Sequence, residues 1–287
     1  METLNTYKPQ DIIPAFLAPD HIINHDHAHS DEKNAAKNQN IRDSLHRALK
    51  LNSVNIFAQP IVTLPQRKTA FIEIFGRLNA QPGAYIPAQD FMIIANEEHL
   101  INRLDTLVLT NALRFIRKQK YKNIVQGYFI NIKPYTLRNG IFMNRLVKEL
   151  SETQDLSRLL IFEMSHSDFM MLSPAEIKIL HALAGIGCRF SLDHMTTIPD
   201  NVPQLHAGYI SFIKIKASTL IKEGKDDDGF KSVINKKRIL DVNGIHMIIE
   251  HVENEHAVLN ALDYNIGYGQ GFLFGKPDFQ SVYVPRL

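Results

Sequence analysis

RLLIFEMSHSDFMMLSPAEIKILHALAGIGCRFSLDH, residues 158–194, has the pattern of one strand, one helix and a second strand. RLLIFEM and RFSLDH are short apolar runs. Between them, SPAEIKILHALAGIG has the apolar spacing of a helix that begins at Ser173 and ends at glycines. Apolar strands linked through a helix are typical of a parallel sheet covered on both faces. The stretch therefore predicts an α/β fold.

The same alternation continues in both directions along the chain. Strands are expected at residues 55–64, 69–78, 127–133, 158–164, 189–194, 209–216, 246–252 and 266–274, and helices at 40–52, 87–98, 101–120, 141–152, 173–187, 229–244 and 254–265. About eight strands in roughly 245 residues match the size of a (β/α) barrel. A doubly wound open sheet is the alternative.

The first part of the chain differs from the rest. Residues 1–38 contain Pro9, Pro14 and Pro19 and then the polar run HDHAHSDEKNAAKNQN, without a persistent period, which predicts a flexible tail or linker. Its histidines lack the fixed partners of a structural zinc site, and we interpret them as solvated. Residues 39–287 are expected to form one domain that opens with an amphipathic helix. The charged run GKDDDG, residues 224–229, is interpreted as a solvated loop.

Composition excludes several classes of protein. The 287 residues carry a formal net charge of +2, which does not indicate binding to a nucleic acid polymer. The sequence has no run of about 18 apolar residues, so no membrane span is expected, and it shows no secretory signal. The single cysteine, Cys188, lies in an apolar run and is expected to be buried; it excludes an internal disulfide and favours a reducing compartment, so a cytoplasmic location is expected.

Polar side chains recur at or near the ends of successive apolar strands. They are Glu73, Asn131, Glu163, Asp193, Lys214 and Glu250. In a barrel the carboxyl ends of the strands meet at one mouth, where active sites lie. Carboxylate and amide oxygens suit Mg²⁺ or Mn²⁺, and a lysine beside such an ion can neutralise phosphate charge. The phosphate-binding GxxxxGK[ST] loop and the GxSxG elbow are both missing from the sequence.

From about residue 41 onward, the chain resembles the EAL family of cyclic-di-GMP phosphodiesterases and receptors. AQPIV (58–62) resembles YQPIV, EIFGR (73–77) stands in the place of E-A-L-x-R, and NIKP (131–134) resembles N-x-S-P. IFEMSHS (161–167) resembles L-E-I-T-E-S, SLDH (191–194) stands where L-D-D-F-G-T-G is usual, and FIKIK (212–216) stands for L-K-I-D. The long segment 249–277 resembles A-E-G-V-E-T…G-Q-G-Y-L-F-x-x-P.

This resemblance implies a modified TIM-like (β/α)8 barrel whose first strand runs antiparallel to the others, with cyclic di-GMP as the ligand. It implies a first Mg²⁺ or Mn²⁺ held by Glu73, Asn131, Glu163 and Asp193, and a hydrolytic water acted on by Lys214 and Glu250. It also implies a dinucleotide cradle formed by Gln59, Phe75, Arg77, Asp105, Gln270 and Pro277.

The chain departs from the family pattern at four places. His194 replaces the second Asp of D-D, a position the family uses for a second metal, and Lys216 replaces the Asp of K-I-D. Lys216 either faces the pocket, where it opposes a second cation or replaces the missing ion against a phosphate, or points outward. The loop after Asp193 lacks the usual glycines, although Glu253, its expected anchor, is retained. Phe75 replaces the smaller Leu of E-A-L.

Hydrolysis with two metals needs both ions, whereas binding depends more on the cradle. We therefore expect a cyclic-di-GMP receptor with weak or absent phosphodiesterase activity, in which at most a single metal site is kept and no metal is strictly required for binding. An active phosphodiesterase that produces pGpG and an interaction domain that has lost the ligand are the alternatives. A protein partner and a homodimer are family-level expectations.

Overall fold

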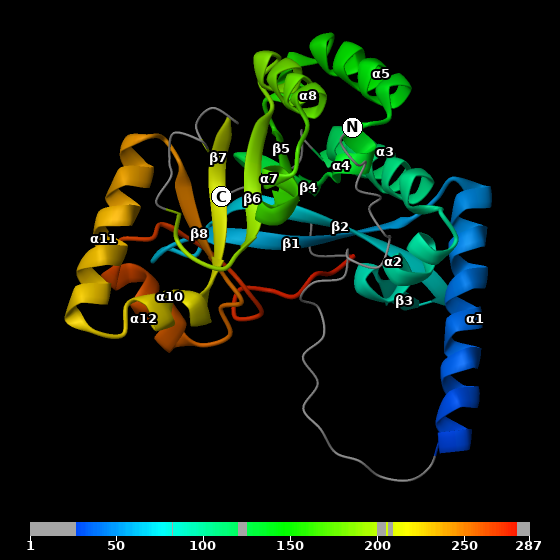
Figure 1. Cartoon of the computed structure of the whole chain (residues 1–287), viewed down its shortest axis with the longest axis horizontal. Coiled ribbons are helices and arrows are strands. Elements are labelled where there is room, and N and C mark those ends of the chain that lie inside the picture. Colours follow the sequence, from blue (N-terminus) through cyan, green and yellow to red (C-terminus); the bar gives the residue numbers. More distant parts are fainter. Residues whose placement is uncertain (1–26, 82, 120–124, 200–204, 206–208, 280–287) are drawn as a thin grey trace, which may run out of the picture. The chain divides into compact units, whose positions relative to one another are not determined.

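The computed structural model describes residues 27–81, 83–119, 125–199, 205 and 209–279 (Figure 1). The chain divides into two compact units, Met1–Gln39 and Asn40–Leu287. Within the described residues, no helix combines the length and the apolar character needed to cross a membrane.

The larger unit is built on a closed barrel. Its strands are β1 (Asn55–Thr63), β2 (Thr69–Gln81), β4 (Gly127–Asn131), β5 (Leu160–Ser165), β6 (Arg189–Met195), β7 (Ile210–Lys216), β8 (His246–Glu250) and β9 (Tyr268–Gln270). They follow the order β1-β9-β8-β7-β6-β5-β4-β2, and a β1–β2 pairing closes the ring. β1 is antiparallel to both of its neighbours, whereas the other ring pairings are parallel. The predicted barrel with an antiparallel first strand is confirmed, and the open sheet is excluded.

Helices surround the strands. They are α1 (His27–Leu51), α2 (Ala88–Glu97), α3 (Ile101–Gln119), α4 (Pro134–Leu137), α5 (Gly140–Ser151), α6 (Gln154–Ser157), α7 (His166–Met170), α8 (Pro174–Gly185), α10 (Ala217–Glu223), α11 (Asp227–Val242) and α12 (Glu255–Asp263). α10 contacts β7 and α11 contacts β8 (Figure 1). The predicted start of α8 is confirmed: the Ser173 side chain accepts from the backbone of Glu176, whose carboxylate accepts from the backbone of Ser173. A short added strand, β3 (Ala84–Pro87), forms a hairpin with β2.

The structure differs from the sequence reading at several places. α1 begins at His27, so a helix extends into the segment expected to be a tail; the prolines and His25 lie outside the described residues. The run GKDDDG lies between two helices: Asp226 caps α11 by accepting from the backbone of Gly229, and Asp227 and Asp228 form its first turn. α10 was not expected, and neither were β3 and the short helices α4, α6 and α7. In contrast, the predicted apolar stripe of α1 is confirmed, because Ile41, Leu45, Ala48 and Leu49 are all buried.

Aromatic rings fill the amino-terminal end of the barrel. Phe71, Phe129 and Phe212 meet edge to face, with ring centroids 5.2–5.5 Å apart. The guanidinium of Arg189 lies 5.8 and 5.5 Å from the centroids of Phe71 and Phe212, and it donates to the Gln126 carbonyl at 2.6 Å. Successive inward-facing positions are two residues apart on a strand. The next inward layer therefore begins with Glu73 on β2, Asn131 on β4 and Lys214 on β7.

Candidate functional site

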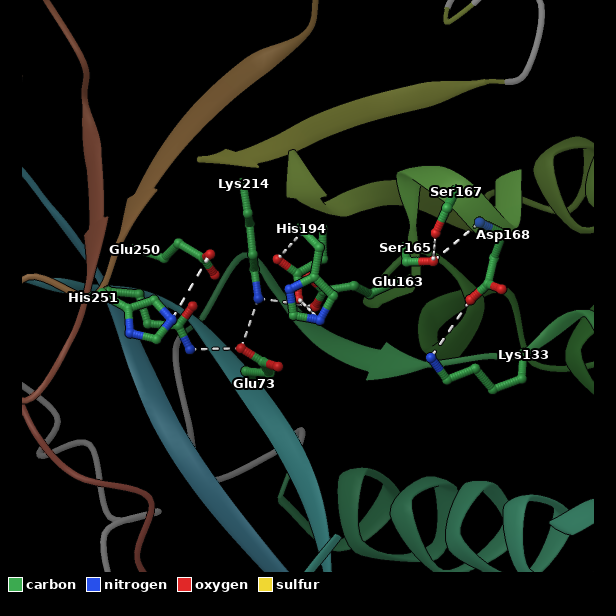
Figure 2. Close-up of polar contacts among 12 residues, drawn as sticks. Glu73, Lys133, Glu163, Ser165, Ser167, Asp168, His194, Lys214, Glu250 and His251 are labelled. Atoms are coloured by element: carbon green, nitrogen blue, oxygen red, sulfur yellow. Dashed lines mark hydrogen bonds and ion pairs between the residues drawn. The ribbon is translucent and has the colours of Figure 1, made fainter. Parts of the chain in front are cut away.

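The barrel mouth gathers the charged strand-end residues predicted from the sequence. Figure 2 shows Lys214 between Glu73 and Glu163, with Glu250 and His194 around it. In the register of the sheet, Asn131 is the Cα partner of Glu163, which places this amide in the same layer. The predicted clustering at one rim is therefore observed.

Lys214 is the centre of this cluster. Its side chain is 1% exposed, and its Nζ donates to Glu73 Oε2 at 2.6 Å and to Glu163 Oε2 at 2.9 Å. Burial alone would lower the pKa of Lys214, but the surrounding carboxylates raise it above its ordinary value. Lys214 is thus positioned as a hydrogen-bond donor to both carboxylates.

Three carboxylates near Lys214 differ in their affinity for a proton. Burial raises the pKa of Glu163 well above its ordinary value. Burial and the neighbouring Asp193 raise the pKa of Glu250 to about 8. Burial would also raise the pKa of Asp193, but Lys214 and His194 hold it below its ordinary value. Asp193 therefore gives up its proton more readily than the neighbouring Glu250.

The donor set fits a divalent cation. Oε1 of Glu163 and Oε1 of Glu250 are buried, and neither has a hydrogen-bond partner among the described residues. Ligand atoms of Asp193, His194 and Glu250 all lie within 4.8 Å of one another. Buried acceptors without donors are costly unless a cation or water joins them. The mouth can therefore hold a cation on oxygen ligands, and the group that includes His194 adds a nitrogen ligand.

The two substituted positions lie at the rim. His194 has φ 55° and is exposed, with its Nε2 3.6 Å from Asp193 Oδ2. The exposed Lys216 ends β7 and is the Cα partner of Glu250, and it occupies the N-cap position of α10 without a side-chain hydrogen bond to that helix. Neighbouring His251 also has a positive φ, 56°. Burial lowers the pKa of His251, as do the nearby charges of Lys216 and His194.

His251 was missed by the sequence reasoning. Its Nε2 lies 3.9 Å from Glu250 Oε1. A signal for it was present, because His251 stands where the family motif A-E-G-V-E has its glycine. Glycine is the residue that adopts a positive φ most readily, so the motif marked this position as unusual for a histidine.

Two glutamines, Gln59 and Gln270, connect Glu73 at the mouth to the segment that follows β9. Gln270 Nε2 donates to Glu73 Oε2 at 2.5 Å and to Gln59 Oε1 at 3.1 Å, and Gln59 Nε2 donates to the Gly275 carbonyl at 2.9 Å. Gly271 is needed beside Gln270, because a Cβ there would lie 2.1 Å from the Val252 carbonyl oxygen. Pro277 is partly buried in the same segment, which bridges to β1 through Ala58 and Asp278.

The remaining residues of the predicted cradle lie on β2 and α3. The guanidinium of Arg77 is 5.3 Å from the centroid of the Phe75 ring, and burial lowers its pKa. Asp105 on α3 accepts a hydrogen bond from Thr136 Oγ1, just beyond the carboxyl end of β4. Burial raises the pKa of Asp105 to about 6, so this carboxylate is ionised at pH 7.5.

The loop after β6 is held by residues that the sequence did not suggest. Glu223 Oε1 accepts from the Ile198 backbone at 2.9 Å, and Lys236 Nζ donates to the Ile198 carbonyl at 3.3 Å. Glu253 is exposed and forms no hydrogen bond or ion pair within the described residues, which leave out 200–204 and 206–208 of this loop. Its predicted role as the loop anchor stays a prediction.

Comparison with known proteins gives a consistent family. The model of the EAL domain matches residues 42–277. The chain is 28% identical over 243 residues to cyclic di-GMP phosphodiesterase PdeA of Borreliella burgdorferi, covering 84% of this chain and 36% of that protein. It is 26% identical over 234 residues to cyclic di-GMP phosphodiesterase PdeF of Escherichia coli K12, covering 81% and 31%. The chain thus spans about a third of the length of these relatives.

Solved structures share the fold. The EAL domain of Xanthomonas citri FimX in complex with c-di-GMP aligns with a TM-score of 0.72 at 16% identity, covering 86% of this chain and 96% of that one. The FimX EAL domain of Pseudomonas aeruginosa bound to c-di-GMP aligns with a TM-score of 0.70 at 19% identity, covering 85% and 98%. Because the family model covers most of the chain and the barrel carries its antiparallel first strand, the chain belongs to the EAL domain family.

Proposed function

We propose that this chain binds cyclic di-GMP at the barrel mouth and acts as a signalling receptor with weak or absent phosphodiesterase activity. One observation carries the proposal. The acidic cluster around Lys214 is complete, whereas His194 and Lys216 stand at the rim where the family pattern has two carboxylates.

Each part of the ligand has a partner of matching chemistry at the mouth. Arg77 offers a guanidinium to a phosphate. Asp105, ionised at neutral pH, offers two oxygens to the N1–H and N2–H of a guanine. Gln59 and Gln270 are already joined to each other and to Glu73, so their positions are set before the ligand arrives. A preorganised cradle loses less entropy on binding.

Glu73, Asn131, Glu163 and Asp193 are the residues that would hold a metal. A bound Mg²⁺ or Mn²⁺ would supply charge neutralisation at the phosphate and a more acidic water. Lys214 orients Glu73 and Glu163 through its two hydrogen bonds and would present a positive charge to the phosphate. Glu250, with a pKa of about 8, is the group that can take up or release a proton near neutral pH.

The two substituted residues at the rim, His194 and Lys216, explain why hydrolysis would be slow. Replacing two carboxylates by a histidine and a lysine removes negative charge from the second-cation position and adds a positive charge to it. A cation there would lack the two carboxylates of the family pattern, and the charge of the exposed Lys216 acts on the neighbouring His251. A displacement that needs an ion at both the attacking and the leaving oxygen would then be impaired.

A second function, an active phosphodiesterase that forms pGpG, is favoured by the closeness of Asp193, His194 and Glu250, whose ligand atoms lie within 4.8 Å. A nitrogen ligand suits Mn²⁺ better than Mg²⁺. On this alternative His194 would replace the missing carboxylate and keep a second ion.

Titration calorimetry with cyclic di-GMP, in EDTA and then with Mg²⁺ or Mn²⁺, separates these functions when product is followed by chromatography. Binding in EDTA without pGpG supports the receptor, and steady turnover with Mn²⁺ supports the enzyme. If no condition gives binding, the chain is an interaction domain and the proposal fails.

Arg77→Ala tests the cradle. It is expected to weaken binding by about 10- to 150-fold, because a hydrogen bond to a charged group contributes roughly 1.5–3 kcal/mol. Arg117→Ala is the control, since Arg117 pairs with Glu149 on the outer helices. Equal affinities of the two variants would remove Arg77 from the cradle. The double substitution His194→Asp with Lys216→Asp is expected to raise hydrolysis; no gain would mean that the altered loop limits the rate.

A further inference from the structure

Aromatic rings collect at the mouth beside Arg77, outside the cradle described above. The ring centroids of Phe57 and Tyr85 lie 4.8 Å apart, and those of Phe57 and Phe279 lie 6.0 Å apart. Tyr85 and Phe279 are nearly parallel, with an interplanar angle of 16°. The guanidinium of Arg77 lies 5.8 Å from the centroid of Phe57. We call Phe57, Tyr85 and Phe279 the rim aromatics.

The reversed direction of β1 explains why these rings lie at the mouth. Because β1 is antiparallel to β2, its amino-terminal end lies beside the carboxyl end of β2. Gln59 pairs with Glu73 in the acidic layer, and Phe57 pairs with Phe75 one inward position further toward the mouth. The rim aromatics thus continue directly from the layer that contains Glu73.

The chain after β9 brings in the third ring. The backbone N–H of Ala58 donates to the Asp278 carbonyl at 3.1 Å, and the N–H of Asp278 donates to the Ala58 carbonyl at 3.0 Å. These two bonds hold the segment alongside β1 and place Phe279 against Phe57. Residues from β1, β3 and the segment after β9 therefore form one surface, although they are distant in the sequence.

The rings of this surface are partly exposed and not buried in the core. Phe279 is 51% exposed and Tyr85 is 37% exposed. Flat aromatic faces beside a guanidinium match a ligand that has a planar base next to a phosphate, because bases stack on aromatic rings and the cation attracts the phosphate. The charge of Glu73 also acts on Arg77, so Arg77 lies at the edge of the acidic cluster.

We propose that the rim aromatics form the stacking surface for one guanine base of the bound dinucleotide, with Arg77 on the adjoining phosphate. This inference rests on the proposed function and extends it to residues that the family motifs do not mark. The other guanine is then bound by the carboxylate of Asp105, which lies on the opposite side of β2 from β1. Each base is held by a different kind of contact: one by stacking and one by its hydrogen-bonding edge.

Calorimetric titration of the full chain with cyclic di-GMP tests the inference. Phe279→Ala and Tyr85→Ala are each expected to weaken binding by about 5- to 150-fold, the range for loss of one stacking contact. Phe279→Leu keeps an apolar side chain but not a flat one and should stay weak, whereas Phe279→Tyr should restore binding. Tyr209→Ala is the matched control, since this aromatic is 49% exposed and lies beside the amino-terminal end of β7, at the other end of the barrel.

A proton NMR spectrum of the bound ligand gives a readout that a general loss of structure would not imitate. Stacking on the rings should shift the H8 signal of one guanine upfield, and Phe279→Ala should abolish that shift while the melting temperature stays within a few degrees of wild type. If the wild type binds while Phe279→Ala and Tyr85→Ala bind equally well, the stacking surface is wrong and the proposed function stands. If the wild type does not bind, both are wrong.

Discussion

Replacing Lys214 by methionine should destabilise the metal-free protein more than any other substitution of a buried lysine. Methionine is an unbranched side chain one atom shorter than lysine, and it carries no charge. Glu73 Oε2 would still accept from Gln270 at 2.5 Å, but Glu163 would lose its partner at 2.9 Å. Because Oε1 of Glu163 already lacks a partner within the described residues, this buried carboxylate would be left without any donor there.

The expected magnitude follows from that isolated charge. Breaking a buried ion pair by removing one partner costs about 3–5 kcal/mol. For a domain of this size, 1 kcal/mol corresponds to about 2–4 °C in Tm, so the loss should be about 6–20 °C. Glu163 can escape part of the cost by taking up a proton, since its pKa is already raised. The loss should therefore be larger at pH 8 than at pH 5.

Urea unfolding in EDTA at both pH values measures this loss. Lys237→Met is the matched control, because Lys237 is also buried but its partner Asp241 is 40% exposed, and such a pair contributes about 0–1 kcal/mol. Lys214→Met combined with Glu163→Gln should recover about 1–3 kcal/mol relative to the sum of the two single losses. The argument would be refuted if Lys214→Met cost no more than Lys237→Met, or if the double substitution were additive.

Three further predictions concern other parts of the molecule. In EDTA, Glu250 should make the protein less stable as pH rises from about 4.5 to about 8, because its raised pKa means that the folded state binds the proton more tightly; urea unfolding of Glu250→Gln should show a flatter pH profile. Burial would raise the pKa of Glu176, but bonds from Ser173 and Arg138 lower it, so its contribution should be present above its ordinary pKa near 4.5 and lost in more acidic solution; Glu176→Gln should remove this acid-side loss from the Tm profile. Gly271→Ala should lower Tm and weaken cyclic di-GMP binding, because its Cβ would clash with the backbone of Val252. Gly140→Ala should do neither, because a Cβ at Gly140 has nothing within 4 Å.

The strands and the acidic cluster were predictable for the same reason. Side chains alternate across a strand, and parallel strands bring their carboxyl ends to one rim, so polar residues at successive strand ends must meet. That rule needs no knowledge of distant contacts. It therefore placed Glu73, Glu163, Lys214 and Glu250 together, but it could not show that Lys214 bonds both Glu73 and Glu163, because such bonds depend on the register between strands far apart in the sequence.

There are also physical reasons why some helices were not predicted from the sequence. α10 has seven residues, of which Ala217 and Leu220 are buried, so it is too short to display a helical period. The acidic run before α11 looked like a solvated loop, yet Asp226, Asp227 and Asp228 are the residues that favour a helix start, since one caps it and the others meet the positive end of its dipole. In α1, the polar run from His27 has no apolar stripe from which a helix could be inferred.

The retained and the altered residues of the mouth differ in how firmly the barrel holds them. Glu73, Glu163 and Lys214 lie within paired strands and are buried, so changing any one of them would disturb the core. His194 lies at an irregularity between β6 and β7, where the backbone adopts φ 55°, and Lys216 is the last residue of β7; both side chains are exposed. Substitution at such strand ends costs the fold little. The positions at which the family pattern has two further carboxylates could therefore change without loss of the buried acidic cluster or of the barrel.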